Sequence, residues 1–123
     1  MKVLLSIKPE YANKILSGEK RFEFRKSIFK KEGIQTVIIY ATMPIGKVIG
    51  EFDIKHILSD EPESIWMKTC ELSGITKSFF DSYFHERTKA YAIEVNSVKK
   101  YDKPLSLSDI KIGLKAPQSF TYI

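Results

Sequence analysis

A short stretch of alternating charged residues, from Gly18 to Arg25, carries the side chains best suited to chemistry. It reads Gly-Glu-Lys-Arg-Phe-Glu-Phe-Arg. Glu23 and Arg25 are two residues apart, so in a strand their side chains share one face. A carboxylate beside a guanidinium holds it in a fixed orientation through charge-assisted hydrogen bonds. In an enzyme, Glu23 can act as a general base, and Lys20 as a base or nucleophile when neighbouring cations lower its pKa.

Lys20 lies three residues before Glu23. On a regular strand it would face the opposite side, so we expect it on the preceding turn or at a bulge, mobile and accessible. Lys8 and Tyr11 stand at the start of a predicted helix close to this turn. Together with Arg25, these side chains predict a cleft for a nucleotide, because cations bind phosphate, a ring stacks on a base and a carboxylate accepts from a base amino group. The alternative is a solvated strand face whose exposed ion pair is worth less than about 1 kcal/mol.

The length and composition of the chain predict one globular domain over residues 1–123. Its residues are 43% hydrophobic and 12% aromatic, which is too many for a disordered chain. The longest apolar run, residues 37–41, is too short to span a membrane, and we expect no membrane association. Cys70 is the only cysteine and makes neither an internal disulfide nor a cysteine zinc site, which fits a reducing cytoplasm.

The basic residues are concentrated at the beginning of the chain. The net charge is +5, from 20 Lys and Arg and 15 Asp and Glu. Residues 1–31 hold nine basic and three acidic residues, whereas the remainder has a net charge of −1. A one-sided basic segment attracts polyanions, of which nucleic acid is the commonest in a cytoplasm. The alternative is that the lysines keep a small domain soluble.

The elements that must position these side chains are mostly strands. Apolar alternation and β-branched residues predict strands at 2–7, 20–26, 35–42, 47–58 and 89–100, and an extended segment at 117–122. Gly50 indicates a bend or bulge in the long strand, in which Val48 and Phe52 are expected on one face. Pro104 is expected to end the strand before it.

Helices are predicted at three places. The first begins at Pro9 and ends at Gly18. Asp60, with Glu63 three residues later, predicts a capping box for the second. Thr76 caps a third, whose aromatic residues at positions 79, 80, 83 and 84 are typical of a buried core. One further short turn is expected at 106–110. The order predicts an α+β fold with a small, curved, mostly antiparallel β-barrel and two or three short helices.

The sequence resembles the ASCH domain family. Gly18-x-Lys20-x-x-Glu23-x-Arg25 matches the G-x-K-x-x-E-x-R signature of that family. The stretch from Leu5 to Gly18 is similar to the strand and helix that precede the signature in bacterial and phage members. Residues 48–52 resemble a second strand of the family, and residues 117–120 resemble its closing segment. The resemblance covers nearly the whole chain.

This resemblance implies a PUA-like barrel with a cleft between the barrel and the first helix, and an RNA-binding role linked to translation or transcription control. The cleft residues that it implies are Lys20, Glu23 and Arg25, with Lys8 and Tyr11 beside them. Ser6 and Gln118 are added as further candidates. We expect RNA or a nucleotide as the ligand, no cofactor, no metal, and a monomer or weak dimer.

Three function classes stay open on the sequence. The first is a binding module for RNA or a nucleotide. The second is a small metal-independent hydrolase that cleaves RNA or, like some ASCH proteins, removes an acyl group from a modified cytidine. The deacylases use a lysine, a threonine and a glutamate; Lys20 matches the lysine, Glu23 stands where the threonine is expected, and Glu71 is the candidate glutamate. The third is a protein adaptor that uses the acidic stretch 51–71.

Two further expectations concern exposure. Cys70 lies in a predicted amphipathic helix and is expected to be a buried small apolar residue. Lys20, Glu23 and Arg25 are expected at the surface, so that replacing any of them by alanine should leave the fold largely intact.

Overall fold

The computed structural model describes every residue from Met1 to Ile123. Its strands are β1 (Lys2–Ile7), β2 (Phe22–Arg25), β3 (Thr36–Ala41), β4 (Lys47–Asp60), β5 (Ala90–Leu105) and β6 (Phe120–Tyr122). Its α-helices are α1 (Pro9–Ser17), α2 (Pro62–Thr69), α3 (Lys77–Tyr83) and α4 (Leu107–Ile110), and a 3-10 turn, Cys70–Leu72, follows α2. No helix is long and apolar enough to cross a membrane.

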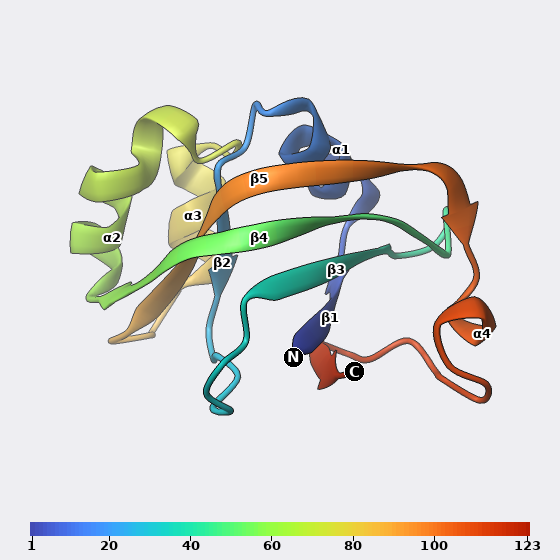
Figure 1. Ribbon diagram of the computed structural model, residues 1–123. Helices are drawn as coiled ribbons and strands as arrows, with labels where there is room; N and C mark the ends of the chain where they lie inside the picture. The colour runs from blue at the N-terminus through green and yellow to red at the C-terminus, as the bar shows by residue number, and fades with distance from the viewer.

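All six strands belong to one sheet, in the order β2-β5-β4-β3-β1-β6. Only β1 and β3 run parallel, and the other neighbours are antiparallel. The long β4 and β5 cross the molecule, with α2 and α3 at one end and α4 at the other (Figure 1). The sheet curls into a half-barrel with β2 and β6 as its two edges, which confirms the predicted PUA-like α+β fold. Four helices flank it, where two or three were predicted.

The middle of the sheet is buried on both faces. In β1, Val3 and Leu5 belong to a core of 13 buried residues that also includes Ala12 and Ile15 of α1. Leu4, between them, belongs to a second cluster that packs beneath α4. Strands covered on both faces have near-continuous apolar sequences rather than an alternating pattern. This explains why the segments 2–7 and 36–41 are so rich in Val, Ile and Leu.

The predicted bulge at Gly50 is confirmed, since the pairing of β4 with β5 shifts between Val48 and Gly50. The shift corrects the face assigned to Val48. Val48 packs with Leu4 in the cluster near α4, whereas Phe52 packs with Ile49 in the main core. A bulge adds one residue to a strand, so the residues before it exchange faces relative to those after it.

Two predicted boundaries are wrong. The capping box at Asp60 does not form, because β4 continues through Asp60 and α2 begins at Pro62 with Glu61 as its N-cap. Proline suits the first helical position because its missing N–H has no partner there. Pro104 does not end β5, which continues to Leu105. At this end of the sheet the strand pairs only with β4, and proline is tolerated on the unpaired side of an edge.

The two helices nearest the candidate residues begin as predicted, and α1 also ends as predicted. Pro9 opens α1, and Gly18 closes it with a φ of 89°, a left-handed conformation that glycine adopts readily. The chain then runs through Lys20 into β2. Thr76 caps α3 by accepting a hydrogen bond from the Phe79 amide. The two helices meet where Phe79 of α3 stacks on Tyr11 of α1, beside Lys20.

Candidate functional site

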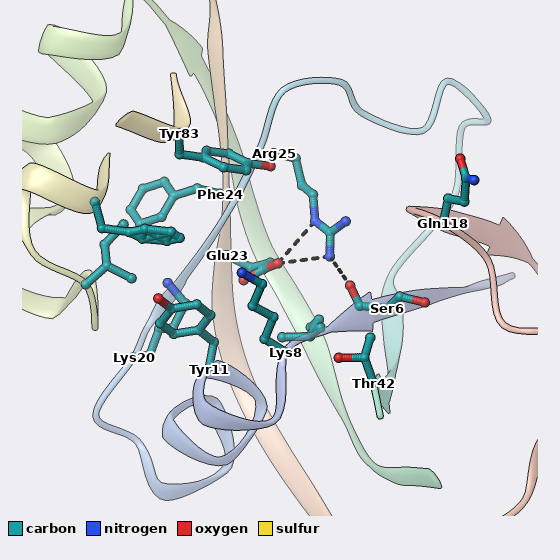
Figure 2. Close-up of a pocket in the computed structure, with 13 residues that line it drawn as sticks. Ser6, Lys8, Tyr11, Lys20, Glu23, Phe24, Arg25, Thr42, Tyr83 and Gln118 are labelled. Atoms are coloured by element: carbon teal, nitrogen blue, oxygen red, sulfur yellow. Dashed lines mark hydrogen bonds and ion pairs between the residues drawn. The ribbon is translucent and has the colours of Figure 1, made fainter. Parts of the chain in front are cut away.

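A cavity of about 360 Å³ lies between α1, α3, β2 and the ends of β1 and β3. Thirteen residues line it: Ser6, Ile7, Lys8, Tyr11, Lys20, Glu23, Phe24, Arg25, Thr42, Ile75, Phe79, Tyr83 and Gln118. The structure therefore brings all seven predicted site residues to one cavity, and their role in binding stays a prediction. Its volume lies in the range of small-molecule sites. Figure 2 shows an aromatic end, with Tyr11, Phe24 and Tyr83, and a polar end, with Ser6, Thr42 and Gln118.

Lys20 is buried at the aromatic end, with only 2% of its surface exposed. Its ammonium donates to the carbonyl oxygen of Ser73 at 2.7 Å and lies 4.7 Å from the ring centre of Phe24 and 5.6 Å from that of Tyr11. Burial lowers the pKa of Lys20 to about 8, although the nearby Glu23 carboxylate opposes this effect. The prediction of a mobile, accessible lysine is wrong, because the connection between α2 and α3 covers this side chain.

Gly74 is required for that covering connection. Its φ is +71°, and a Cβ placed there would lie 2.6 Å from the Lys20 Cβ and 2.7 Å from its Cγ. We therefore predict that Gly74→Ala lowers the free energy of unfolding by about 1–3 kcal/mol, from backbone strain and from displacement of the lysine stem. Urea unfolding measures this change, with Gly33→Ala as the control. Gly33 also has a positive φ but open space around it, so an equal loss in both variants would contradict the steric contact.

The side chains of Glu23 and Arg25 form an ion pair in which each is only 10% exposed. Glu23 Oε2 accepts from Arg25 Nη2 at 2.9 Å and from Nε at 3.1 Å. The guanidinium also donates to the Ser6 carbonyl oxygen at 2.9 Å and to Ser119 Oγ at 3.2 Å. Both predicted surface positions are therefore corrected to buried ones. Arg25 spans from β2 to β1 and the C-terminal segment, and most of its donors are occupied within the protein.

The aromatic end of the cavity includes Phe79 and Tyr83, which were predicted as core residues. Phe79 stacks on Tyr11 with ring centres 5.4 Å apart, and Tyr83 lies beside Phe79. The actual core residues here are Phe80 in α3 and Phe84 at its C-cap, which are almost fully buried. Residues 79 and 83, like 80 and 84, are four apart and share a helix face. A short helix with two adjacent apolar faces can pack on two partners. Here one face packs in the core and the other packs on Tyr11 at the cavity, and the spacing of the aromatic residues is the signal that the sequence offers.

Two lysines lie at the rim of the aromatic end. Lys8 Nζ lies 5.9 Å from the Phe79 ring centre, and Lys26 Nζ lies 4.7 Å from that of Tyr83. Burial raises the pKa of Tyr11 and of Tyr83 above the usual value, so both phenols stay protonated at neutral pH. Rings for stacking and ammonium groups for phosphate are the combination that single-stranded nucleic acid requires.

The polar end is built where three segments meet. Ser6 Oγ donates to the carbonyl oxygen of Pro117 at 2.6 Å, which holds the C-terminal segment against β1. Thr42, at the end of β3, lines the cavity and was not among the predicted residues. Its position on a strand followed by a turn carries no chemical signal in the sequence. Gln118 is exposed at the rim.

Two other residues considered in the sequence lie elsewhere. Glu71 is exposed on the 3-10 turn after α2 and does not line the cavity. Cys70 is also exposed, so the expectation of a buried cysteine is wrong. No group of three or more His, Cys, Asp or Glu side chains is placed to hold a metal ion.

Two proteins with similar sequences differ in how much of their own length this chain covers. It is 31% identical over 122 residues to "Large ribosomal subunit protein uL22" of Ureaplasma parvum, covering 98% of this chain and 39% of that protein. The chain thus spans well under half of that relative. It is 28% identical over 123 residues to "ASCH domain-containing ribonuclease" of Zymomonas mobilis, covering 98% of this chain and 82% of that protein.

The fold is also found among solved structures. The crystal structure of ASCH from Zymomonas mobilis superposes with a TM-score of 0.91 at 27% sequence identity, over 99% of this chain and 87% of the other. The family model described as "ASCH domain" matches residues 5–99, which include the Gly18–Arg25 signature and every residue that lines the cavity except Gln118. The chain therefore belongs to the ASCH domain family.

Proposed function

We propose that this chain binds single-stranded RNA in the cavity and cleaves it there. The observation that carries the proposal is the placement of Lys20 and Glu23 on one cavity floor, beside aromatic rings that can hold a base. The similarity to an ASCH domain-containing ribonuclease supports it. Unpaired bases can stack on the rings, and the rim lysines can hold the phosphates on either side.

The site contains the groups for an attack by the ribose 2′-hydroxyl on the adjacent phosphorus. Glu23 accepts the hydroxyl proton while the O2′–P bond forms. Lys20, as an ammonium, stabilises the phosphate oxygens and gives its proton to O5′ as the P–O5′ bond breaks. The products are a 2′,3′-cyclic phosphate and a free 5′-hydroxyl. A pKa of about 8 makes Lys20 a far better proton donor at neutral pH than an ordinary lysine.

Arg25 has a different role in this proposal. Its donors bind Glu23, Ser6 and Ser119, so it holds the carboxylate in position rather than contacting the phosphate. The deacylase alternative receives less support, because Glu71 does not line the cavity. A module that binds RNA without cleaving it would use the same cavity, and turnover separates the two.

The test is cleavage of a 12-nucleotide, 5′-labelled single-stranded RNA by the pure protein in EDTA, followed by gel electrophoresis and mass spectrometry. We predict fragments ending in 2′,3′-cyclic phosphate, no cleavage of the DNA of the same sequence, and a loss of about 100-fold or more in Glu23→Gln. Glu19→Gln is the matched control, since Glu19 is exposed and outside the cavity. RNA retention without turnover would leave a binding module, and cleavage of DNA would contradict the 2′-hydroxyl mechanism.

A further inference from the structure

The end of the sheet near α4 carries lysines that form no salt bridge. Lys47, Lys103 and Lys111 are exposed, and none is within 4.0 Å of a carboxylate oxygen. We call these three residues the lysine surface. At the other end of the sheet, three lysines are paired with acids: Lys55 with Glu94, Lys68 with Asp60, and Lys77 with Glu63 and Asp81. Lys26 and Lys89 at that end form no salt bridge, but each lies over an aromatic ring, that of Tyr83 and that of Tyr91.

The lysines of this surface come together through the pairing of β4 with its neighbours. Val48, next to Lys47, pairs with Leu105, two residues after Lys103. The positive charges of both lysines lower the pKa of Asp109 in α4, in addition to the larger effect of its hydrogen bonds to Ser106. Lys111 follows α4 directly. Asp109, which caps that helix, carries one negative charge against the three lysines, so these four residues together have a net positive charge.

The lysine surface adjoins the polar end of the cavity. Ala41, which precedes the cavity residue Thr42, is the direct strand partner of Lys47. Directly opposite residues in an antiparallel pair have Cα atoms about 4.5–5.5 Å apart, less than the length of one nucleotide. From Lys111 the chain leads through residues 112–117 to Gln118, the other rim residue of that end. Figure 1 shows α4 and the end of β5 opposite to α2 and α3, and Figure 2 shows Thr42 and Gln118 at the end of the cavity remote from Tyr83.

We propose that the substrate is a single strand longer than the cavity, whose phosphates beyond the cleavage site lie on the lysine surface. This inference rests on the proposed function and names the length of RNA that the site prefers. Unpaired ammonium groups attract a phosphate chain, and each phosphate neutralised releases counterions, which makes binding dependent on salt. A dinucleoside monophosphate has a single phosphate, which lies at the cleavage site, so it has no further phosphate for the lysine surface.

The test compares Lys47→Gln/Lys103→Gln/Lys111→Gln with the matched variant Lys55→Gln/Lys68→Gln/Lys77→Gln, which loses the same charge at the other end. Binding of a fluorescein-labelled 12-nucleotide RNA is measured by anisotropy against salt. We expect the first variant to raise the Kd about tenfold. The slope of log Kd against the logarithm of the salt concentration should fall by about 2, because each phosphate contact of a single strand contributes about 0.7 to that slope. The Kd of the second variant should stay within about twofold of the wild-type value. Cleavage of dinucleoside monophosphates should be equal in all three proteins.

Equal weakening by both triple variants, or no change in the first, would overturn the lysine surface even when the RNA is cleaved normally. Loss of dinucleotide cleavage in the first variant would also overturn it, because these lysines would then act within the cavity. Absence of cleavage by the wild-type protein would contradict the proposed function instead. The anisotropy measurements would then still decide whether these lysines hold RNA.

Discussion

Replacement of Lys20 by methionine is expected to reduce RNA cleavage about 100-fold or more while the protein stays folded. Methionine fills the space of the lysine stem between Tyr11 and Phe24 but carries no charge and no proton. Lys14→Met is the matched control, because Lys14 donates to the next carbonyl, that of Gly74, yet does not line the cavity. Cleavage rates are measured with the labelled RNA. Similar losses in both variants would show that support of the α2–α3 connection, not Lys20 chemistry, is what matters.

The pH dependence gives this prediction a second readout. The wild-type cleavage rate should fall above pH about 8, as Lys20 loses the proton that it must donate. The free energy of unfolding should change in the opposite sense. Because the folded pKa is about 8 and the ordinary value is 10.5, the unfolded chain binds more protons between these pH values. Wild-type stability should therefore rise from pH 8 towards pH 10.5, relative to Lys20→Met, by up to roughly 3 kcal/mol. A constant difference between the two proteins across this range would contradict the buried ammonium.

Arg25→Met should cause the largest loss of stability among the cavity residues. The change leaves the Glu23 carboxylate buried without its partner and removes the contacts to Ser6 and Ser119. Breaking a buried ion pair from one side typically costs about 3–5 kcal/mol, so we expect a loss of about 3 kcal/mol and a fall in Tm on the order of 10 °C. Thermal unfolding followed by circular dichroism measures both. Lys77→Met, which removes two exposed ion pairs, should change the Tm far less.

A double variant separates the pair from the other contacts of Arg25. Glu23→Gln/Arg25→Met should be less destabilised than the sum of its single variants, because an uncharged amide in place of the carboxylate leaves no buried charge without a partner. Strict additivity would mean that the contacts to Ser6 and Ser119, rather than the ion pair, account for the effect of Arg25.

Features set by local sequence were predictable. Pro9 and Gly18 mark the ends of α1, and the spacing of Glu23 and Arg25 on β2 puts both on one face, as observed. Thr76 is a helix cap because its hydroxyl satisfies an amide three residues later. These are short-range effects, in which the residues that determine the conformation are close together in the chain. The bulge at Gly50 is likewise visible in the sequence, although its effect on Val48 is not.

Features set by distant contacts were not predictable in the same way. The burial of Lys20 depends on Ser73 and Gly74, more than fifty residues later in the chain. The position of Thr42 beside Ser6 depends on the parallel pairing of β1 with β3, which local periodicity does not specify. Cys70 is exposed because α2 ends at Thr69 and the chain continues as a 3-10 turn rather than along the same buried face. A single sequence without its contact map carries no signal for any of the three.

The two edges of the half-barrel are joined by a side chain instead of a backbone ladder. β2 and β6 stand at opposite ends of the strand order, and the Arg25 guanidinium bridges from β2 to Ser6 on β1 and to Ser119 beside β6. A closed barrel of paired strands has a diameter fixed by the number of its strands and their stagger. Here the side chain of Arg25, and no backbone ladder, connects the two edges, so substitutions at this contact can change the cavity without altering the pairing of any strand. The width of the gap between β2 and β6 can therefore change with these side chains, and the same sheet can be adapted to ligands of different size.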